Sequence, residues 1–312
     1  LAILTGIRYR DNSLFMNNSD VESNFNPQFT DVQSLVTYDI SSKISLQFLG
    51  NIAINQYDFQ PISRRTKFGT LANPLELIVN YEGRENNRYQ TYFGALNTLY
   101  QLNEKTKLQL TTSSYNTQES EYFDILAQYN IGEVDTDLSS NNFGNVGFTD
   151  AIGSQLNHAR NDYDALIRQI YFRGSYLNNK TALDWGLKYQ VENIMDKTNE
   201  WEVIDSLGFA VRPISHLPNN QPYTAFEGPI VPFNYINTFN EIDIKRWNGF
   251  VQWSQSFEWK QFQWWVNLGN RFHYWNISGN NIQKYSDIIF SPRFQLAFKP
   301  NANENLLFRI SG

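Results

Sequence analysis

An alternation of apolar and polar side chains over more than ten residues is the feature that most constrains the fold of this chain. Between Lys43 and Asn55 most odd-numbered positions are polar, and the even-numbered positions are apolar or glycine, namely Ile44, Leu46, Phe48, Gly50, Ile52 and Ile54. Because successive side chains of a β-strand point to opposite faces, this pattern predicts a strand with one apolar face. The run exceeds the about 5 to 6 residues of an average strand and matches the roughly 9 to 11 residues of a tilted membrane-spanning strand.

The same alternation recurs along the sequence. The recurrence predicts about eleven strands, near residues 2–14, 28–40, 43–57, 88–102, 106–118, 163–177, 181–195, 243–259, 261–277, 286–299 and 305–312. The signal of a single membrane strand is weak, so the repetition carries the prediction.

Short polar turns alternate with long connections between these strands. The short turns lie near residues 41–42, 103–106, 178–180, 260 and 300–305, and the long connections near 15–27, 59–87, 119–161, 196–242 and 278–285. This asymmetry predicts an up-and-down barrel with all short turns at one rim, whereas a β-sandwich has no reason to segregate its connections. Tyr38, Tyr100 and Tyr176 precede short turns, where an interfacial aromatic belt is expected, although ordinary strand propensity also favours aromatic residues.

Composition narrows the class of protein. Aromatic residues make up 16% of the 312 residues and charged residues 18%, while the mean hydropathy is −0.49. No apolar run approaches the roughly 18 residues of a membrane helix, but a β-barrel needs only every second strand residue to be apolar. The absence of cysteine excludes disulfides and thiolate metal sites, and the net charge of −6 argues against a nucleic-acid partner.

Catalytic motifs are absent from the sequence. His158, His216 and His273 are far apart and form no metal-binding spacing, and there is no nucleophile elbow or phosphate-binding glycine loop. We therefore expect no enzyme, no cofactor and no metal site.

The predicted fold class is an all-β, antiparallel, up-and-down transmembrane β-barrel. Alternation is already in progress at Leu1 and continues towards Gly312, and lone strands in lipid would leave backbone groups unpaired. We therefore expect residues 1–312 to form a partial barrel domain, with about eleven strands of a larger circuit.

Several stretches of the sequence resemble one family. They are Leu4–Arg10, Phe93–Thr98, Phe123–Ile125 with Gln128 and Tyr129, His158–Asn161, Trp201–Ser206 and Ser291–Phe294. In these stretches the chain resembles the barrel of TonB-dependent outer-membrane receptors from Bacteroidota, in which a carboxypeptidase-regulatory-like domain precedes the plug.

The resemblance implies a barrel of 22 strands in the cell outer membrane, around a plug, that imports a scarce ligand after plug movement. The implied partners are the TonB complex through an N-terminal region, the protein's own plug domain, outer-membrane lipid and an unknown imported ligand, with a surface lipoprotein as a further candidate. The plug, the N-terminal domain and the C-terminal strands are expected to lie outside these residues.

Two sets of side chains are candidates for contact with a ligand. The first comprises polar residues expected to face the lumen, namely Asp184, Lys188, Glu192, Arg271, His273 and Arg293. The alternative for each is that it merely hydrates a filled interior. The second comprises aromatic residues of the long connection 196–242, namely Trp201, Tyr223, Phe226, Phe233 and Tyr235. Such rings can stack on a ligand, and the alternative is that they form the loop's own hydrophobic cluster.

A second functional hypothesis is a soluble carbohydrate-binding or structural protein with a β-sandwich or propeller fold. It predicts that Trp185, Trp264 and Leu268 are buried against a second sheet.

Overall fold

The computed structural model describes residues 1–12, 24–70, 72–205, 231–280, 282–301 and 306–312. This part of the chain forms one 12-stranded sheet. The strands are β1 (Ala2–Asp11), β2 (Asn24–Ser41), β3 (Ile44–Gln60), β4 (Arg64–Thr70), β5 (Asn73–Asn103), β6 (Thr106–Val134), β7 (Val146–Asn178), β8 (Thr181–Asp205), β9 (Asn234–Trp259), β10 (Phe262–Gly279), β11 (Ile282–Pro300) and β12 (Phe308–Ser311).

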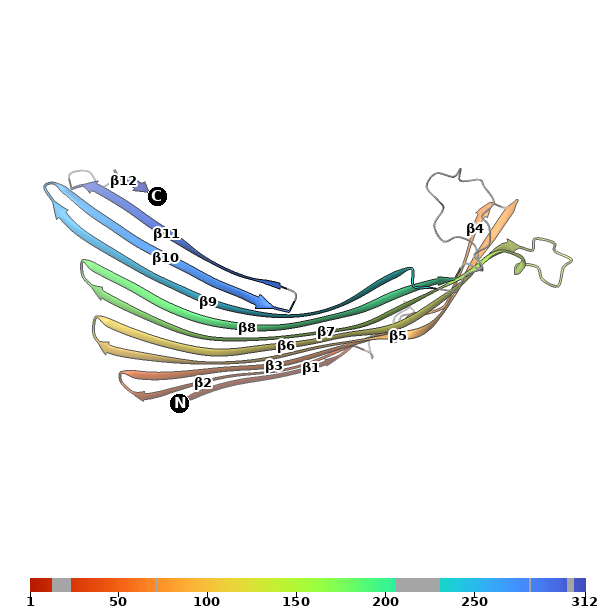
Figure 1. Cartoon of the computed structure of the whole chain (residues 1–312), viewed down its shortest axis with the longest axis horizontal. Helices are drawn as coiled ribbons and strands as arrows, with labels where there is room; N and C mark the ends of the chain where they lie inside the picture. Colours follow the sequence, from red (N-terminus) through yellow and green to blue (C-terminus); the bar gives the residue numbers. More distant parts are fainter. Residues whose placement is uncertain (13–23, 71, 206–230, 281, 302–305) are drawn as a thin grey trace.

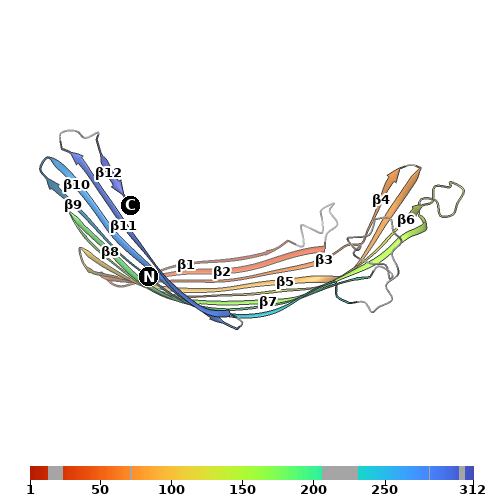
Figure 2. The same ribbon diagram turned by 45° about the horizontal axis from the view of Figure 1, so that its top comes forward.

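Neighbouring strands pair antiparallel in chain order, except that β4 pairs only with β5 at one end of the sheet. Figures 1 and 2 show a single curved sheet, with β1 at one edge and β11 and β12 at the opposite edge. The predicted all-β antiparallel class is therefore confirmed, with β4 added to the expected set of strands. The β-sandwich or propeller alternative is wrong for the described strands, because they form one sheet and Leu268 is 43% exposed.

The short turns lie where the sequence predicts them. Ser41 Oγ accepts hydrogen bonds from the backbone N–H groups of Lys43 and Ile44, both at 3.2 Å, and so closes the β2–β3 turn. Asn103 Oδ1 accepts from the backbone N–H of Lys105 at 3.0 Å in the β5–β6 turn. The β9–β10 turn contains Lys260 in the left-handed region, at φ 58°.

Three predicted long connections are wrong. β4 and the first part of β5 fill much of 59–87, and β6 and β7 extend through most of 119–161. Gly279 pairs with Ile282, so β10 and β11 fill most of the connection predicted at 278–285. Both faces of the extended strands carry many polar residues, and the alternation that marks a half-apolar strand therefore fades although the backbone pairing continues.

We name the end of the sheet formed by β4, residues 73–82 and residues 125–134 the wing. Figure 2 shows that it turns away from the main sheet. Arg65 donates two hydrogen bonds to the carboxylate of Glu76, at 3.1 and 3.0 Å, and Glu76 is only 2% exposed. Lys67 Nζ donates to the carbonyl oxygen of Gly144 at 2.5 Å. These contacts join β4 to β5 and to the β6–β7 connection.

Gly83 lies at the base of the wing. Its φ of +106° favours glycine, and a Cβ built there would lie 1.9 Å from the carbonyl oxygen of Asp124. Gly83→Ala is therefore expected to separate β5 from β6 locally, at a strain of roughly 1–3 kcal/mol plus the clash. Hydrogen exchange should become faster in residues 73–82 and 125–134. Gly94→Ala, on the same strand with no atom closer than 4.0 Å to the added Cβ, should leave exchange unchanged; equal effects of the two variants would contradict this account.

The two faces of the sheet differ in burial. Side chains inside a curved sheet converge and cover one another, whereas those outside diverge. The buried residues of the main sheet other than glycine share one face by register, and they are Pro27, Ala159, Ala165, Glu192, Ile244 and Ala297. Large apolar residues on the other face are 38–74% exposed, and they include Ile7, Phe48, Leu96, Leu110, Phe172, Leu187, Val251, Leu268 and Phe294. We therefore identify the first face as concave and the apolar face as convex.

Candidate functional site on the concave face

An apolar band on the convex face fixes how the sheet is oriented. The band runs from Ile44 to Ile54 on β3, from Leu183 to Val191 on β8 and from Trp264 to Tyr274 on β10, with polar residues following on each strand. Each of these spans is close to the roughly 9 to 11 residues that a tilted strand needs to cross a bilayer. The band therefore covers almost the same number of residues on each of these strands.

The register shows that the strands are tilted relative to this band. One row of paired residues leads from Ile44 across β5, β6, β7, β8 and β9 to Asn270 on β10. Ile44 begins the band on β3, whereas Asn270 lies six residues after Trp264, which begins the band on β10. With about 4.8 Å between strands and about 3.3 Å per residue, this stagger over six strand steps corresponds to a tilt of about 35°. Transmembrane barrels have tilts of about 35–45°.

Aromatic rings gather at the short-turn end of the band. Trp264 packs against Phe298 with ring centroids 4.8 Å apart, and Phe298 stacks on Phe308 at 4.9 Å. Lys260 Nζ lies 4.8 Å from the ring centroid of Trp259, which is 57% exposed. Large rings with polar neighbours at this level are typical of the membrane interface.

The polar residues predicted to face a lumen all lie on the concave face. Lys188 pairs through Asn248 with His273 in one row across β8, β9 and β10. Asp184, Glu192, Arg271 and Arg293 have the same side-chain direction by register. The alternation read from the sequence therefore assigned these residues to a common face, and whether that face lines a lumen remains a prediction.

Hydrogen bonding separates these residues into two groups. Glu192 Oε1 lies 2.5 Å from Arg246 Nε and accepts a second hydrogen bond from Gln190 at 2.8 Å. Asp184 Oδ1 lies 3.4 Å from Nη2 of Arg173. Both acidic candidates thus have cationic partners on neighbouring strands, which supports a structural role for them.

The basic candidates form the second group. Among the described residues, no carboxylate forms an ion pair with Lys188, Arg271 or Arg293. Lys188 Nζ donates to Gln190 Oε1 at 2.9 Å, and the guanidinium of Arg271 lies 5.7 Å from the ring centroid of Phe250. The short-turn half of the concave face therefore carries unpaired positive charge over β8, β10 and β11.

The far half of the concave face on β5–β8 is acidic. Its carboxylates, which form no ion pair with a described residue, are Glu85, Glu119, Glu121, Asp196, Glu200 and Glu202. Tyr89 donates to Glu121 Oε1 at 2.7 Å. Burial raises the pKa of Tyr89, and the bond to Glu121 raises it further, so the phenol stays protonated beyond its usual range. This separation of charge could not be predicted from the sequence, because the residues come from strands far apart in the chain.

The aromatic candidates are not gathered into one loop. Trp201 lies in β8 and Tyr235 in β9, where they pair with each other on the convex side. Phe233 directly precedes β9, and its backbone N–H donates to the carbonyl oxygen of Glu202 at 2.6 Å. Tyr223 and Phe226 lie outside the described residues. The prediction that Trp201 and Tyr235 are loop residues is therefore wrong, because β8 and β9 extend beyond the apolar band.

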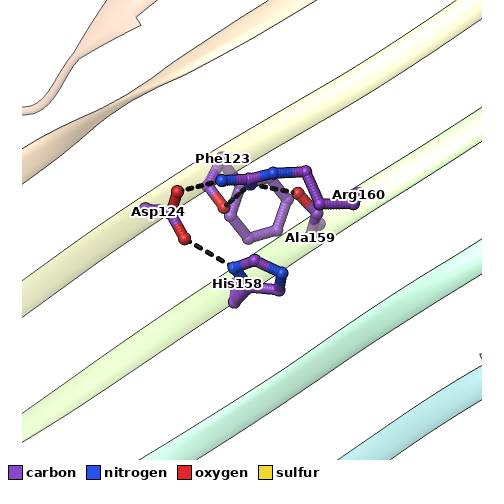
Figure 3. A network of polar contacts seen from close by, with 5 residues as sticks. All are labelled: Phe123, Asp124, His158, Ala159 and Arg160. Atoms are coloured by element: carbon purple, nitrogen blue, oxygen red, sulfur yellow. Dashed lines mark hydrogen bonds and ion pairs between the residues drawn. The ribbon is translucent and has the colours of Figure 1, made fainter.

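Figure 3 shows a polar network that sequence reasoning missed, formed by Phe123, Asp124, His158, Ala159 and Arg160. Asp124 accepts a hydrogen bond from Arg160 and lies 2.6 Å from Nδ1 of His158. Arg160 Nη1 also donates to the carbonyl oxygens of Phe123, at 3.0 Å, and Ala159, at 2.7 Å. The ring of His158 stacks on Trp201 with centroids 4.5 Å apart. The pairing of β6 with β7 brings Asp124 and His158 together, and the pairing of β7 with β8 places Trp201 beside them.

This network predicts a pH effect. Burial acts to raise the pKa of Asp124, but the hydrogen bonds from Arg160 and His158 outweigh it and hold the pKa below its usual value. A folded-state pKa below the unfolded-state value means that ionised Asp124 stabilises the folded protein. This contribution to the free energy of unfolding is complete above about pH 3.9, the pKa in the unfolded chain, and is lost as the pH falls through the folded-state pKa. Fluorescence of the His158–Trp201 stack should change on acidification below pH 4 in the wild type. Asp124→Asn should remove that change, and an identical acid transition in both proteins would contradict the assignment.

The described residues show no metal centre. No group of three or more His, Cys, Asp or Glu side chains in this part of the chain is placed to hold a metal ion. Within the same residues, no helix is long and apolar enough to cross a membrane.

Comparisons with known proteins show similarity to a solved structure. No family model matches the sequence, and no curated protein matches it. Among solved structures, the chain is similar to BauA, the ferric preacinetobactin receptor from Acinetobacter baumannii, with a TM-score of 0.38 and 10% sequence identity. The match covers 98% of this chain and 46% of that one, so the chain spans about half the length of this receptor.

Proposed function

We propose that this chain is part of a TonB-dependent active-transport receptor in the cell outer membrane, of the Bacteroidota type with plug and carboxypeptidase-regulatory-like domains. The observation that carries the proposal is the tilted apolar band on the convex face. The same strands have apolar side chains on the convex face and polar side chains on the concave face. A soluble sheet would leave this band in water, and exposed apolar patches of such extent mark contact with a membrane or a partner.

The sheet is open, and this supports the expectation of further strands. The outer edge of β1 and most of β11 have no partner strand among the described residues, since β12 pairs only with Gln295–Phe298. Unpaired backbone groups in a bilayer cost several kcal/mol each, so a membrane sheet of this kind has to close. The short-turn rim would face the periplasm and the wing the outside.

The proposed mechanism is binding followed by gating. The extracellular side, including the connection that carries Tyr223 and Phe226, captures a ligand, and force from the TonB complex on the plug opens a path along the concave wall. No bond in the ligand is broken. Outer-membrane lipid surrounds the apolar band, and a surface lipoprotein remains a candidate partner.

Fractionation of cells that produce the full-length protein tests the proposal. We expect the protein in the outer-membrane fraction, with an electrophoretic mobility that changes on heating because a closed barrel resists detergent. Recovery in the soluble fraction without detergent would overturn the membrane assignment. A membrane protein whose mobility does not change on heating would overturn the closed barrel.

A further inference from the structure

A patch of hydrogen-bond donors lies on the concave face of β8–β11. It consists of Lys188, Asn248, His273, Arg271 and Arg293, and none of these side chains is a carboxylate. We propose that this donor patch binds an oxyanion, a carboxylate or phosphate-like group carried by the transported solute. The proposal rests on the function proposed above, and it adds the chemical class of the ligand.

Among the described residues, no carboxylate forms an ion pair with the donor patch. The carboxylates nearest to it in the sheet are engaged elsewhere. Asp184 faces Arg173 and Glu192 faces Arg246, while Asp287 accepts from Tyr285 at 3.1 Å and from the backbone N–H of Ile288 at 2.7 Å. A group of like charges without paired counter-charges attracts ions of the opposite sign.

His273 provides a second, independent observation. Its Nε2 atom is buried and has no hydrogen-bond partner among the described residues. A buried polar atom without a partner costs about 1–3 kcal/mol, so a missing partner is expected at this position. With the proton on Nε2, the ring would donate to an oxygen.

The size of the donor patch favours a small group over a protein surface. Lys188 and His273 are two strands apart, so their backbones lie about 10 Å from each other. Arg271 is two residues from His273 on the same strand, and Arg293 occupies the adjacent strand diagonally, opposite Gly269. On β8 the patch ends on either side of Lys188, at the ion-paired residues Asp184 and Glu192. Arginine and lysine are the side chains that bind carboxylate and phosphate-like groups, and Arg271 and His273 are close enough to contact the same group.

These 312 residues contain no cysteine, so a single introduced thiol can be modified selectively. Its reaction rates report the electrostatic potential at the donor patch and whether an anion occupies it. Ser291 pairs with Arg271 on the concave face, so Ser291→Cys places a thiol inside the patch. Ser113, on the concave face of β6, provides a Ser→Cys control whose direct cross-strand partners, Ala95 and Gln169, are uncharged. Both variants are made in the full-length protein, with any cysteine elsewhere replaced.

The first readout is the rate of modification by anionic and cationic methanethiosulfonate reagents of similar size. For each variant we compare the ratio of the rate with the anionic reagent to the rate with the cationic reagent. We expect this ratio to be about tenfold higher for Ser291→Cys than for Ser113→Cys, because the local positive potential concentrates anions. Adding Arg271→Gln and Arg293→Gln, the two arginines nearest to Ser291, should abolish the difference. Equal ratios at the two positions would refute the proposal.

The second readout is protection by inorganic phosphate and by citrate against a neutral thiol reagent. Either anion should slow the reaction of Ser291→Cys, with sodium chloride at the same ionic strength as the control, and should leave Ser113→Cys unaffected. Slowing that is equal at both positions overturns the site. A Ser291→Cys thiol that no reagent modifies also overturns it, because a polypeptide would then cover the donor patch. Fractionation judges the membrane assignment separately, so failure of one proposal is distinguishable from failure of the other.

Discussion

Leu110→Arg is expected to lower the free energy of unfolding from lipid vesicles by about 2–4 kcal/mol, the range for arginine on the lipid face of a transmembrane barrel. Leu110 lies on the convex face of β6, is 42% exposed and has Thr98 and Phe172 as its cross-strand partners. In a bilayer the guanidinium would have to leave water or distort the lipid. In water the same substitution on an exposed residue would have an effect within about 0.5 kcal/mol.

The matched control is Ser113→Arg on the same strand. Ser113 has the opposite side-chain direction, and its cross-strand partners are Ala95 and Gln169. An arginine there would extend over the polar concave face, and the free energy of unfolding should change by less than about 1 kcal/mol. Denaturant titration in vesicles, followed by tryptophan fluorescence, measures both variants. If Ser113→Arg destabilised the protein as much as Leu110→Arg, the assignment of the two faces would fail.

The strands that cross the apolar band could be predicted from sequence because a bilayer demands alternation. Each band residue has either lipid or water beside it, and Leu187 and Lys188 show the difference directly, with Leu187 43% exposed on the convex face. Where both faces meet water, that demand disappears. The extensions of β5, β6 and β7 and the strand β4 were missed for this reason, although their backbone pairing is continuous.

The faces of the candidate residues could also be predicted, but their partners could not. Alternation places Glu192 and Lys188 on one face from local sequence alone. The partner of Glu192 is Arg246, which lies 54 residues away, and only the pairing of β8 with β9 brings the two together. The orphan Nε2 of His273 depends in the same way on its neighbours across the sheet. A single strand pattern specifies the direction of a side chain, whereas its hydrogen bonds depend on strand register.

Removing the partner of Glu192 is therefore expected to have a large effect. Glu192 is 8% exposed and the side chain of Arg246 is 31% exposed, so Arg246→Met would leave a carboxylate that is largely withdrawn from water with only the Gln190 amide as donor. Breaking a fully buried pair costs roughly 3–5 kcal/mol, and partial exposure reduces the expected loss here to about 2 kcal/mol. The double variant Glu192→Leu with Arg246→Met should regain most of that loss, because neither charge is then left unpaired.

The same double-mutant cycle on Arg173 and Asp184, whose side chains are 48% and 34% exposed, should give a coupling free energy below about 1 kcal/mol. Unfolding of all variants in vesicles measures the two couplings, and a coupling at Glu192 no larger than that at Asp184 would show that curvature of the sheet does not shield the concave face from water.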